Sequence, residues 1–310
     1  MTLLHEALAN QGPLSRSEVL DLGVGRRQID EAPEYRVHRG VYCEKAPSLD
    51  LMMAARAALA SCAQPALVSG LAGLRLLETA IPYSLGHGEW TPREPICLVV
   101  HSGKARVRRP GIECHRTHQT LEPWCEVDGI PIAHPARSWL YTAATADVNA
   151  LVLLGDALLR RQGPLIRPEE LGAVFSNPGC VPGIKKARHA LALIRPGTES
   201  TGESWTRLQI IRAGLPCPEV SIVVPRPDTG SFSIIDLGYE ELMIGVECDG
   251  PHHTDPGQME RDVDRENALK ALGWRIIRAT ASTYRDPTSF IEALRIARSE
   301  AIALRHARAA

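Results

Sequence analysis

Two carboxylates flank one cysteine where an apolar stretch of the chain ends, in the segment VECDGPHH from Val246 to His253. The residues before it, ELMIGV, are apolar and β-prone, which predicts that Glu247 and Asp249 end a strand. Alternate residues of a strand point to the same side of a sheet, so we expect these two acids to share a face. The turn that follows would aim His252 or His253 at the same place.

Two further acids are expected to join this pair. Asp236 ends the stretch SFSIIDL, so that the acids read D-x10-E-x-D, and Glu203 lies in the segment TGESWTRLQIIRAG, which reads as a helix. Converging carboxylates repel one another by a few kcal/mol at moderate dielectric, and a hard cation such as Mg²⁺ or Mn²⁺ removes that cost. Such an ion lowers the pKa of a bound water molecule and polarises a phosphate. Acids at strand ends can also be merely solvated, which is the alternative.

The elements that must position these acids follow one another in the last third of the chain. Apolar periodicity and turn residues predict the order α-β-β-β-α-β-α over residues 199–310, an α/β arrangement around a mixed sheet. The expected helix from Gly257 to Leu272 offers a candidate for a positive charge near these acids. At 100° per residue, Asp262 and Arg265 fall on the side of Leu269 and Leu272, which are expected to face the sheet.

The position of Arg265 leads to a specific expectation. We expect its guanidinium to reach the acids, oriented by Asp262, and to supply positive charge there. The alternative is a structural salt bridge from Arg265 to Asp262 or Glu266. His253 is a second candidate, as a general base or phosphate donor, because histidine titrates near neutral pH. The apolar residues of this helix are expected in its core, namely Met259, Val263, Leu269 and Leu272.

The phrases GESWTRL, IDL, GVECDGPHH and MERDVDRENALKALGWRII resemble the PD-(D/E)XK nuclease superfamily. The resembling branch contains small bacterial endonuclease-like domains akin to very-short-patch repair endonucleases. The resemblance covers about residues 199–304, and it implies that Asp236 and Glu247 bind the metal, with help from Glu203. Asp249 stands where the wider superfamily has a lysine, and a carboxylate cannot supply the positive charge of that lysine.

The first residues of the chain, about 1–45, are typical of a winged helix-turn-helix. LLHEALAN predicts a helix, Ser15 to Glu18 form a capping box for a second helix, and GRRQIDEA predicts a third. YRVHRGVYC predicts two short strands that form a wing. A basic first turn suits the major groove and basic wing residues suit phosphates. The expected DNA-binding residues are Arg26, Arg27, Gln28, Arg36, His38 and Arg39. A packing or dimerisation domain is the alternative.

Residues 46–165 are expected to form a mixed α+β domain, and residues 166–198 a connector with some helix. MMAARAALASCAQPALVSGLAGLRLL predicts a helix pair, and ICLVVHS and GIECHRT predict strands joined by a basic hairpin turn. That turn carries Lys104, Arg106, Arg108 and Arg109, which would contact a nucleic-acid backbone or simply be solvated. GPLSRSEVLDLGVGRRQI, YRVHRGVY and HPARSWL resemble the N-terminal half of AbiEi-type antitoxin-like proteins. The resemblance implies DNA binding by the winged helix and does not establish a toxin partner.

Cysteine and histidine residues raise a separate question of metal binding. Zinc takes Cys and His ligands, but the spacing C-H-x2-H-x6-C of Cys114, His115, His118 and Cys125 matches no familiar finger. Pro123 also interrupts the set, which favours strand and loop residues without a metal. None of the eight cysteines forms a CxxC pair, and together they are expected to be reduced thiols in a cytoplasm.

Length and composition limit the classes of function. The chain has 310 residues, enough for two or three domains, and 35 basic against 36 acidic residues, so its charge balance indicates neither a nucleic-acid nor a membrane partner. It has no long apolar run and no basic start, which predicts neither a transmembrane helix nor a signal peptide. The four acids and the nuclease resemblance, not the composition, lead us to expect a metal-dependent DNA endonuclease that acts on duplex or structured DNA in repair or in defence against foreign DNA, with no small-molecule cofactor and an unknown protein partner. A non-catalytic antitoxin-like regulator with a degenerate nuclease fold is the alternative, and RNA as substrate is a third.

Overall fold

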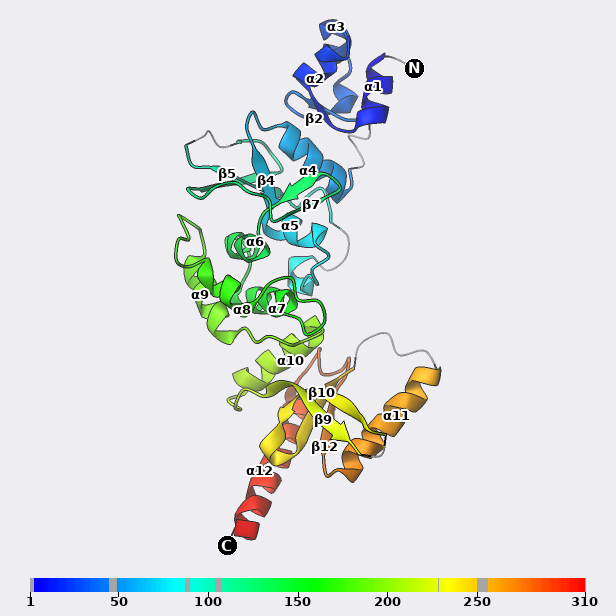
Figure 1. Cartoon of the computed structure of the whole chain (residues 1–310), viewed down its shortest axis with the longest axis vertical. Helices are drawn as coiled ribbons and strands as arrows, with labels where there is room; N and C mark the ends of the chain where they lie inside the picture. Colours follow the sequence, from blue (N-terminus) through cyan, green and yellow to red (C-terminus); the bar gives the residue numbers. More distant parts are fainter. Residues whose placement is uncertain are drawn as a thin grey trace. The chain divides into compact units, whose positions relative to one another are not determined.

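The chain forms a mixed α/β structure with several sheets (Figure 1). The computed structural model describes residues 3–44, 49–86, 90–103, 107–227, 229–249 and 256–309. Its contacts divide it into two compact units, the first of residues 1–158 and 165–193 and the second of residues 159–164 and 194–310. No helix in the described ranges has the length and apolar character needed to cross a membrane.

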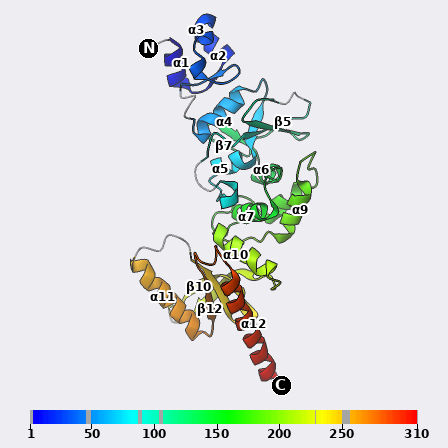
Figure 2. The ribbon, with the colours of Figure 1, turned by 180° about the vertical axis from the view of Figure 1, so that it is seen from behind.

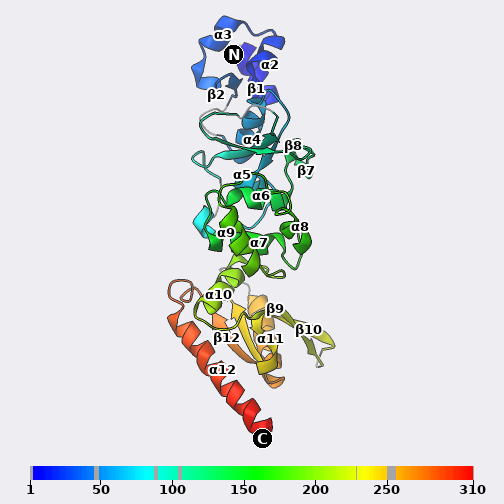
Figure 3. The same ribbon diagram turned by 90° about the vertical axis from the view of Figure 1, so that its left-hand side faces the viewer.

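The first unit begins with three helices beside a small antiparallel sheet of order β1-β3-β2 (Figure 3). These elements are α1 (Leu3–Gln11), β1 (Leu14–Ser15), α2 (Arg16–Asp21), α3 (Arg26–Asp30), β2 (Arg36–His38) and β3 (Val41–Tyr42). The predicted capping box is confirmed, because the Ser15 side chain accepts from the Glu18 N–H and the Glu18 side chain accepts from the Ser15 N–H. Leu4, Leu8, Val19 and Ile29 form the core between the helices.

The rest of the first unit is built on a five-stranded sheet of order β6-β5-β4-β8-β7. Its strands are β4 (Ala66–Ser69), β5 (Ile96–His101), β6 (Ile112–Thr117), β7 (Cys125–Val127) and β8 (Ile130–Ile132). Its helices are α4 (Leu51–Ala60), α5 (Gly70–Leu76), α6 (Pro135–Thr142), α7 (Val148–Leu158), α8 (Pro168–Ala173) and α9 (Ile184–Leu193).

Two expectations for this sheet are wrong. The stretch predicted as a helix pair is a helix, a strand and a helix, because the apolar residues of β4 pair with β5 on one side and β8 on the other. The basic segment between β5 and β6 is not a hairpin, because these strands are parallel, with Ile96 opposite Ile112. Parallel strands run in the same direction, so the chain must travel back along the length of the first strand before the second strand begins.

The second unit has a four-stranded mixed sheet of order β12-β11-β10-β9 between helices. The expected order of elements is confirmed, with α10 (Thr201–Arg212), β9 (Glu219–Arg226), β10 (Ser231–Tyr239), β11 (Ile244–Cys248), α11 (Pro256–Ala271), β12 (Arg275–Ala279) and α12 (Thr288–Ala309). Figure 2 shows α11 and α12 on opposite sides of the strands. Residues of α10 and α12 pack on one face of the sheet, and Leu269 of α11 packs on the other.

The expected core of α11 is only partly correct. Leu269 is 1% exposed and packs with Trp274 and Ile235, as the helix pattern predicts. Val263 is 53% exposed and Leu272 is 37% exposed, so neither belongs to the core. Val263 lies about 160° around the helix from Arg265 and therefore faces solvent. Leu272 follows the last residue of the helix, and the side chain of Met259 lies outside the described part of the structure.

Candidate functional site

Antiparallel pairing of β10 with β11 brings Asp236 beside Glu247. Leu237 lies opposite Val246, so Asp236 and Glu247 adjoin the same paired position of the two strands, and the charge of Asp236 acts on the Glu247 carboxyl. Asp236 Oδ2 accepts a hydrogen bond of 2.8 Å from the Cys248 N–H, which fixes the carboxylate against β11. The spacing D-x10-E-x-D therefore corresponds to two acids on neighbouring strands.

Burial and mutual repulsion perturb the acids of this site. Glu203 is 6% exposed and Glu247 is 7% exposed. Burial, and then the negative charge of Asp236, raise the pKa of Glu203 and that of Glu247 to about 7. Burial also raises the pKa of Asp236, while Arg265 and Arg161 oppose this effect by their positive charge. The three carboxyls therefore interact, with Asp236 as the member that the other two share, and we call Glu203, Asp236 and Glu247 the acid cluster.

Glu203 has a structural task in addition to its place in the acid cluster. Ser200 is the N-cap of α10, and its hydroxyl accepts from the Glu203 N–H. In return Glu203 Oε2 accepts from the Glu199 N–H at 3.0 Å, and Glu203 Oε1 accepts from the Ser200 hydroxyl at 2.9 Å. The sequence S-T-G-E from Ser200 to Glu203 carries the Ser-x-x-Glu signal of a capped helix start, which the sequence analysis missed here.

Arg265 forms a two-pronged ion pair with Glu247. Its Nη2 lies 2.7 Å from Glu247 Oε2 and its Nη1 lies 3.1 Å from Oε1, while Nη1 also donates to the Ile234 carbonyl at 3.0 Å. Such bidentate pairs fix geometry as well as charge. The contact expected from the helical periodicity is thus present, and Glu247 is the partner. His253 lies outside the described residues, as does the side chain of Asp262, so their roles stay predictions.

Asp249 lies just past the end of β11 and has an arginine as its partner. Its main-chain N–H donates to the Ala279 carbonyl at 2.9 Å, and its Oδ1 lies 3.2 Å from Arg278 Nη1. Arg278 also pairs with Glu266, which in turn lies 2.6 Å from Lys270 Nζ. Asp249 is therefore part of an ion-pair chain that runs along β12 and α11.

The donor chemistry of the acid cluster fits a hard divalent cation. Asp236 and Glu247 offer carboxylate oxygens, the ligands that Mg²⁺ and Mn²⁺ prefer. Their pKa values are raised, and a bound cation would offset the cost of keeping both buried carboxylates ionised. The oxygens are not drawn together as a finished three-ligand site. In the described ranges, three potential ligand atoms that lie within 4.8 Å of one another belong instead to Cys97, Glu113 and His115 of the first unit.

The expected DNA-binding residues are mostly exposed. Arg26, Arg27 and Gln28 lie at the start of α3, and Arg36 and Arg39 lie on or beside β2. Gln28 also accepts from the Gly25 N–H at 3.0 Å and so caps α3, and Arg27 pairs with Glu31 at 2.7 Å. His38 is half-buried. Burial, and then the charge of Arg109, lower its pKa.

A basic groove of about 890 Å³ lies within the first unit, lined by residues of the β2 region and by residues next to the five-stranded sheet. Its lining includes Trp90, Glu94 and His38 together with four arginines, namely Arg36, Arg39, Arg108 and Arg109. Arg109 also donates to the Arg39 carbonyl. These residues belong to separate segments of the sequence, and the fold groups them. Lys104 and Arg106 lie outside the described residues.

The four residues considered for zinc are not brought together. His115 and Cys114 are neighbours on β6, so strand alternation directs them to opposite faces. Cys125 lies on β7 at the other edge of the five-stranded sheet, and His118 pairs with the Ser102 hydroxyl at 2.8 Å. The expectation that this set does not form a finger is consistent with that arrangement.

Comparison with known proteins gives a limited result. No family model matches the chain. Two proteins of Mycobacterium tuberculosis, Uncharacterized protein MT2308 of strain CDC 1551 and Uncharacterized protein Rv2248 of strain H37Rv, are each 32% identical to it over 96 residues. The matched region is 31% of this chain and 35% of each relative, so the chain spans about a third of the length of the curated relatives it matches.

Proposed function

We propose that the chain is a metal-dependent DNA endonuclease whose catalytic site is the acid cluster of the second unit. The observation that carries this proposal is the meeting of Asp236 and Glu247 on adjacent strands, both with raised pKa values and with Arg265 against them. Buried acids with such pKa values are typical of functional sites. The resemblance of this segment to PD-(D/E)XK nucleases supports the same assignment.

The residues of the site have distinct tasks in this proposal. Asp236 and Glu247 bind Mg²⁺ or Mn²⁺, which supplies Lewis-acid chemistry at a phosphate when bound. Glu203 holds the start of α10 in place and adds negative charge beside Asp236. Arg265 orients Glu247 and supplies the positive charge that Asp249 cannot, while Asp249 itself pairs with Arg278. His253 and Asp262 remain candidates for proton transfer and for orienting Arg265.

The first unit would bring the DNA. Three helices followed by the β2–β3 hairpin are the arrangement that a winged helix requires, and this assignment rests on the sequence resemblance and on the exposed Arg26, Arg27, Arg36 and Arg39. Contacts with phosphates need exposed cations of this kind. The basic groove extends the positive surface to Arg108 and Arg109.

A cleavage assay with matched variants tests the enzyme. Purified chain is incubated with single-stranded, duplex, mismatched and branched DNA in Mg²⁺, Mn²⁺ or EDTA. We expect metal-dependent cleavage that is lost in Asp236→Asn and Glu247→Gln and retained in Glu241→Gln, since Glu241 pairs with Arg305 away from the acid cluster. Cleavage that Asp236→Asn leaves unchanged would contradict the assignment. Calorimetry with Mn²⁺ should likewise show binding that Asp236→Ala removes.

The role of Arg265 has its own test. Arg265→Ala should reduce turnover about a hundredfold, which is the effect of losing one transition-state donor. Arg265→Lys keeps a positive charge but loses the bidentate geometry, and it should recover part of that loss. An Arg265→Ala protein that retains full turnover would leave the Glu247 pair with a structural role alone.

A non-catalytic DNA-binding regulator is the second candidate. The observations that favour it are the engagement of Glu247 by Arg265, the engagement of Glu203 as a helix cap and the Asp249–Arg278 pair in place of a free lysine. The regulator would bind duplex DNA and leave every substrate of the assay intact. DNA binding that is equal in wild type and Asp236→Asn, without cleavage by either, would establish this candidate over the enzyme.

A further inference from the structure

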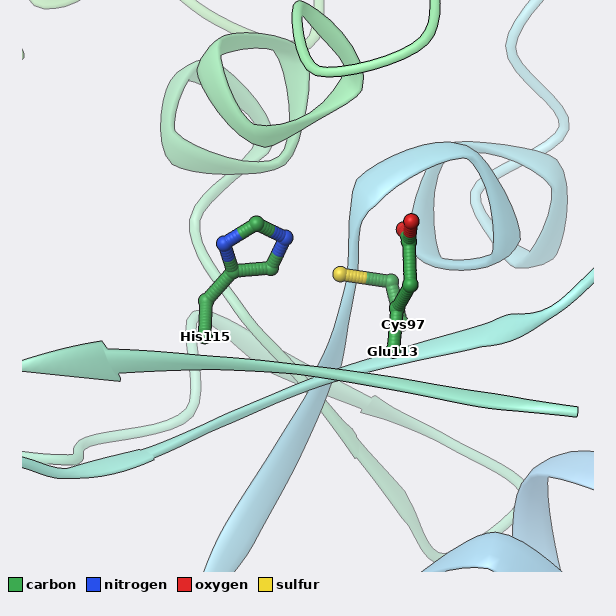
Figure 4. A group of neighbouring side chains, drawn as sticks. All are labelled: Cys97, Glu113 and His115. Atoms are coloured by element: carbon green, nitrogen blue, oxygen red, sulfur yellow. The ribbon is translucent and has the colours of Figure 1, made fainter. Parts of the chain in front are cut away.

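Three potential metal ligands meet on one face of the five-stranded sheet, far along the chain from the acid cluster. Parallel pairing of β5 with β6 places Cys97 directly opposite Glu113, and His115 follows Glu113 by two residues on the same face. Figure 4 shows the sulfur of Cys97 pointing into the space between the carboxylate and the imidazole. This arrangement is independent of the nuclease proposal.

The separations are close to those of a metal site. One ligand atom from each of the three side chains lies within 4.8 Å of the other two. Zinc bonds of about 2.0–2.3 Å in a tetrahedron place ligand atoms roughly 3.3–3.8 Å apart. The ligand atoms therefore lie within about 1.5 Å of the separations that a bound zinc ion requires.

Packing holds two of the ligands in position. Cys97 is 4% exposed and lies directly under the start of α5. A Cβ atom at Gly70 would lie 2.8 Å from Cys97 Cβ and 3.0 Å from its Sγ, so the chain passes over the thiol at a glycine with a φ of 58°. The ring of His115 stacks on Tyr141 of α6, with centroids 4.3 Å apart and planes 12° apart.

One side of the three-residue set faces a groove. A pocket of about 560 Å³ is lined by Glu113 and His115, together with Arg108 and Arg109, whereas Cys97 is not part of its wall. Cys97 is thus the buried member of the set, and Glu113 and His115 are the members whose residues border this groove. A fourth ligand, water or an anionic oxygen, can approach from this groove.

We infer that Cys97 Sγ, a Glu113 carboxylate oxygen and a His115 ring nitrogen form a three-ligand site for a borderline divalent cation of the zinc class. A thiolate and an imidazole favour Zn²⁺ over Mg²⁺ or Ca²⁺, which prefer oxygen ligands. Three protein ligands with an accessible fourth position are the pattern of a reactive zinc site, while closed structural sites have four. The site lies in the first unit and so has its own ion, distinct from that of the acid cluster.

Cobalt substitution tests this site by a signal that the acid cluster cannot produce. Full-length chain freed of metal is titrated with Co²⁺, and near-ultraviolet absorption from a thiolate–cobalt bond is followed together with the visible bands of four-coordinate cobalt. We expect the thiolate absorption to rise to a plateau as Co²⁺ is added and to disappear on addition of Zn²⁺. Glu247→Gln should leave it unchanged, so failure of the acid cluster and failure of this site are distinguishable.

Variants decide which residues bind the ion. Cys97→Ser should abolish the thiolate absorption, and His115→Gln should weaken Zn²⁺ affinity by more than the roughly 10–100-fold that loss of an outer partner causes. Cys114→Ser is the matched control, since Cys114 is the neighbour of His115 on β6 and should keep full absorption. Far-ultraviolet circular dichroism checks folding, and Glu113→Gln gives a second ligand variant if Cys97→Ser unfolds. Absence of thiolate absorption in the wild type, or its loss in Cys114→Ser with retention in Cys97→Ser, would overturn the inference.

Discussion

Replacing Glu247 by glutamine should change how the stability of the chain depends on pH. The pKa of Glu247 is about 7 in the folded protein, against an ordinary value of 4.5, because the carboxyl is buried and faces Asp236. A folded-state pKa above the unfolded one means that the folded protein holds the proton more tightly. The favourable contribution of the Glu247 carboxyl to folding stability is therefore complete at low pH, and it is lost as the pH rises from about 4.5 through about 7.

The size of this effect follows from the pKa difference. About 2.5 pKa units at about 1.4 kcal/mol each amount to about 3 kcal/mol, of which about 2–3 kcal/mol falls between pH 5 and pH 8. The side chain of Glu247 is 9% exposed, so solvent screening reduces this little. Glutamine cannot ionise but keeps an oxygen for the guanidinium of Arg265. The stability of Glu247→Gln relative to wild type should therefore rise by about 2–3 kcal/mol from pH 5 to pH 8.

Urea unfolding in EDTA at pH 5, 6.5 and 8 measures this difference. Glu266→Gln is the matched control, because Lys270 and then Arg278 lower the pKa of Glu266. The contribution of Glu266 to folding stability is present above its unfolded pKa and is lost only as the pH falls through its lower folded-state pKa. This contribution should therefore stay constant from pH 5 to pH 8. Parallel pH curves for wild type and Glu247→Gln would refute the reasoning. Adding Mn²⁺ at pH 8 should raise the free energy of unfolding of the wild-type protein and leave that of Glu247→Gln unchanged.

Three further outcomes are expected. Ser15→Ala removes the capping box of α2 and should lower the free energy of unfolding by about 1 kcal/mol in chemical denaturation. The double change Arg36→Ala and Arg39→Ala should reduce the slope of log affinity for duplex DNA against log salt concentration by about two, as measured by fluorescence anisotropy. An unchanged slope would assign the β2–β3 hairpin a structural role. Gly245→Ala should cost about 1–3 kcal/mol in thermal or urea unfolding, because the new Cβ would lie 2.7 Å from a methyl carbon of Ile276 and 2.9 Å from one of Ile235.

Local patterns in the sequence determined much of the second unit. Alternating and helical periodicity predicted its seven elements in order, because each element buries an apolar face of its own. The same periodicity placed Arg265 on the sheet side of α11, where it meets Glu247. The capping box at Ser15 is local chemistry over four residues and was predicted for the same reason. The function proposed from these residues remains a prediction.

Contacts between distant segments decided the rest. β4 reads as helix by its apolar run, and pairing with β5 and β8 makes it a strand. Sequence alone indicated a hairpin between β5 and β6, whereas the fold makes them parallel. That pairing sets Cys97 opposite Glu113 across a gap of 16 residues in sequence, and it brings His115 to the same group, which no local spacing indicated. Periodicity specifies which face a residue occupies, but only the register between strands specifies which residues share that face.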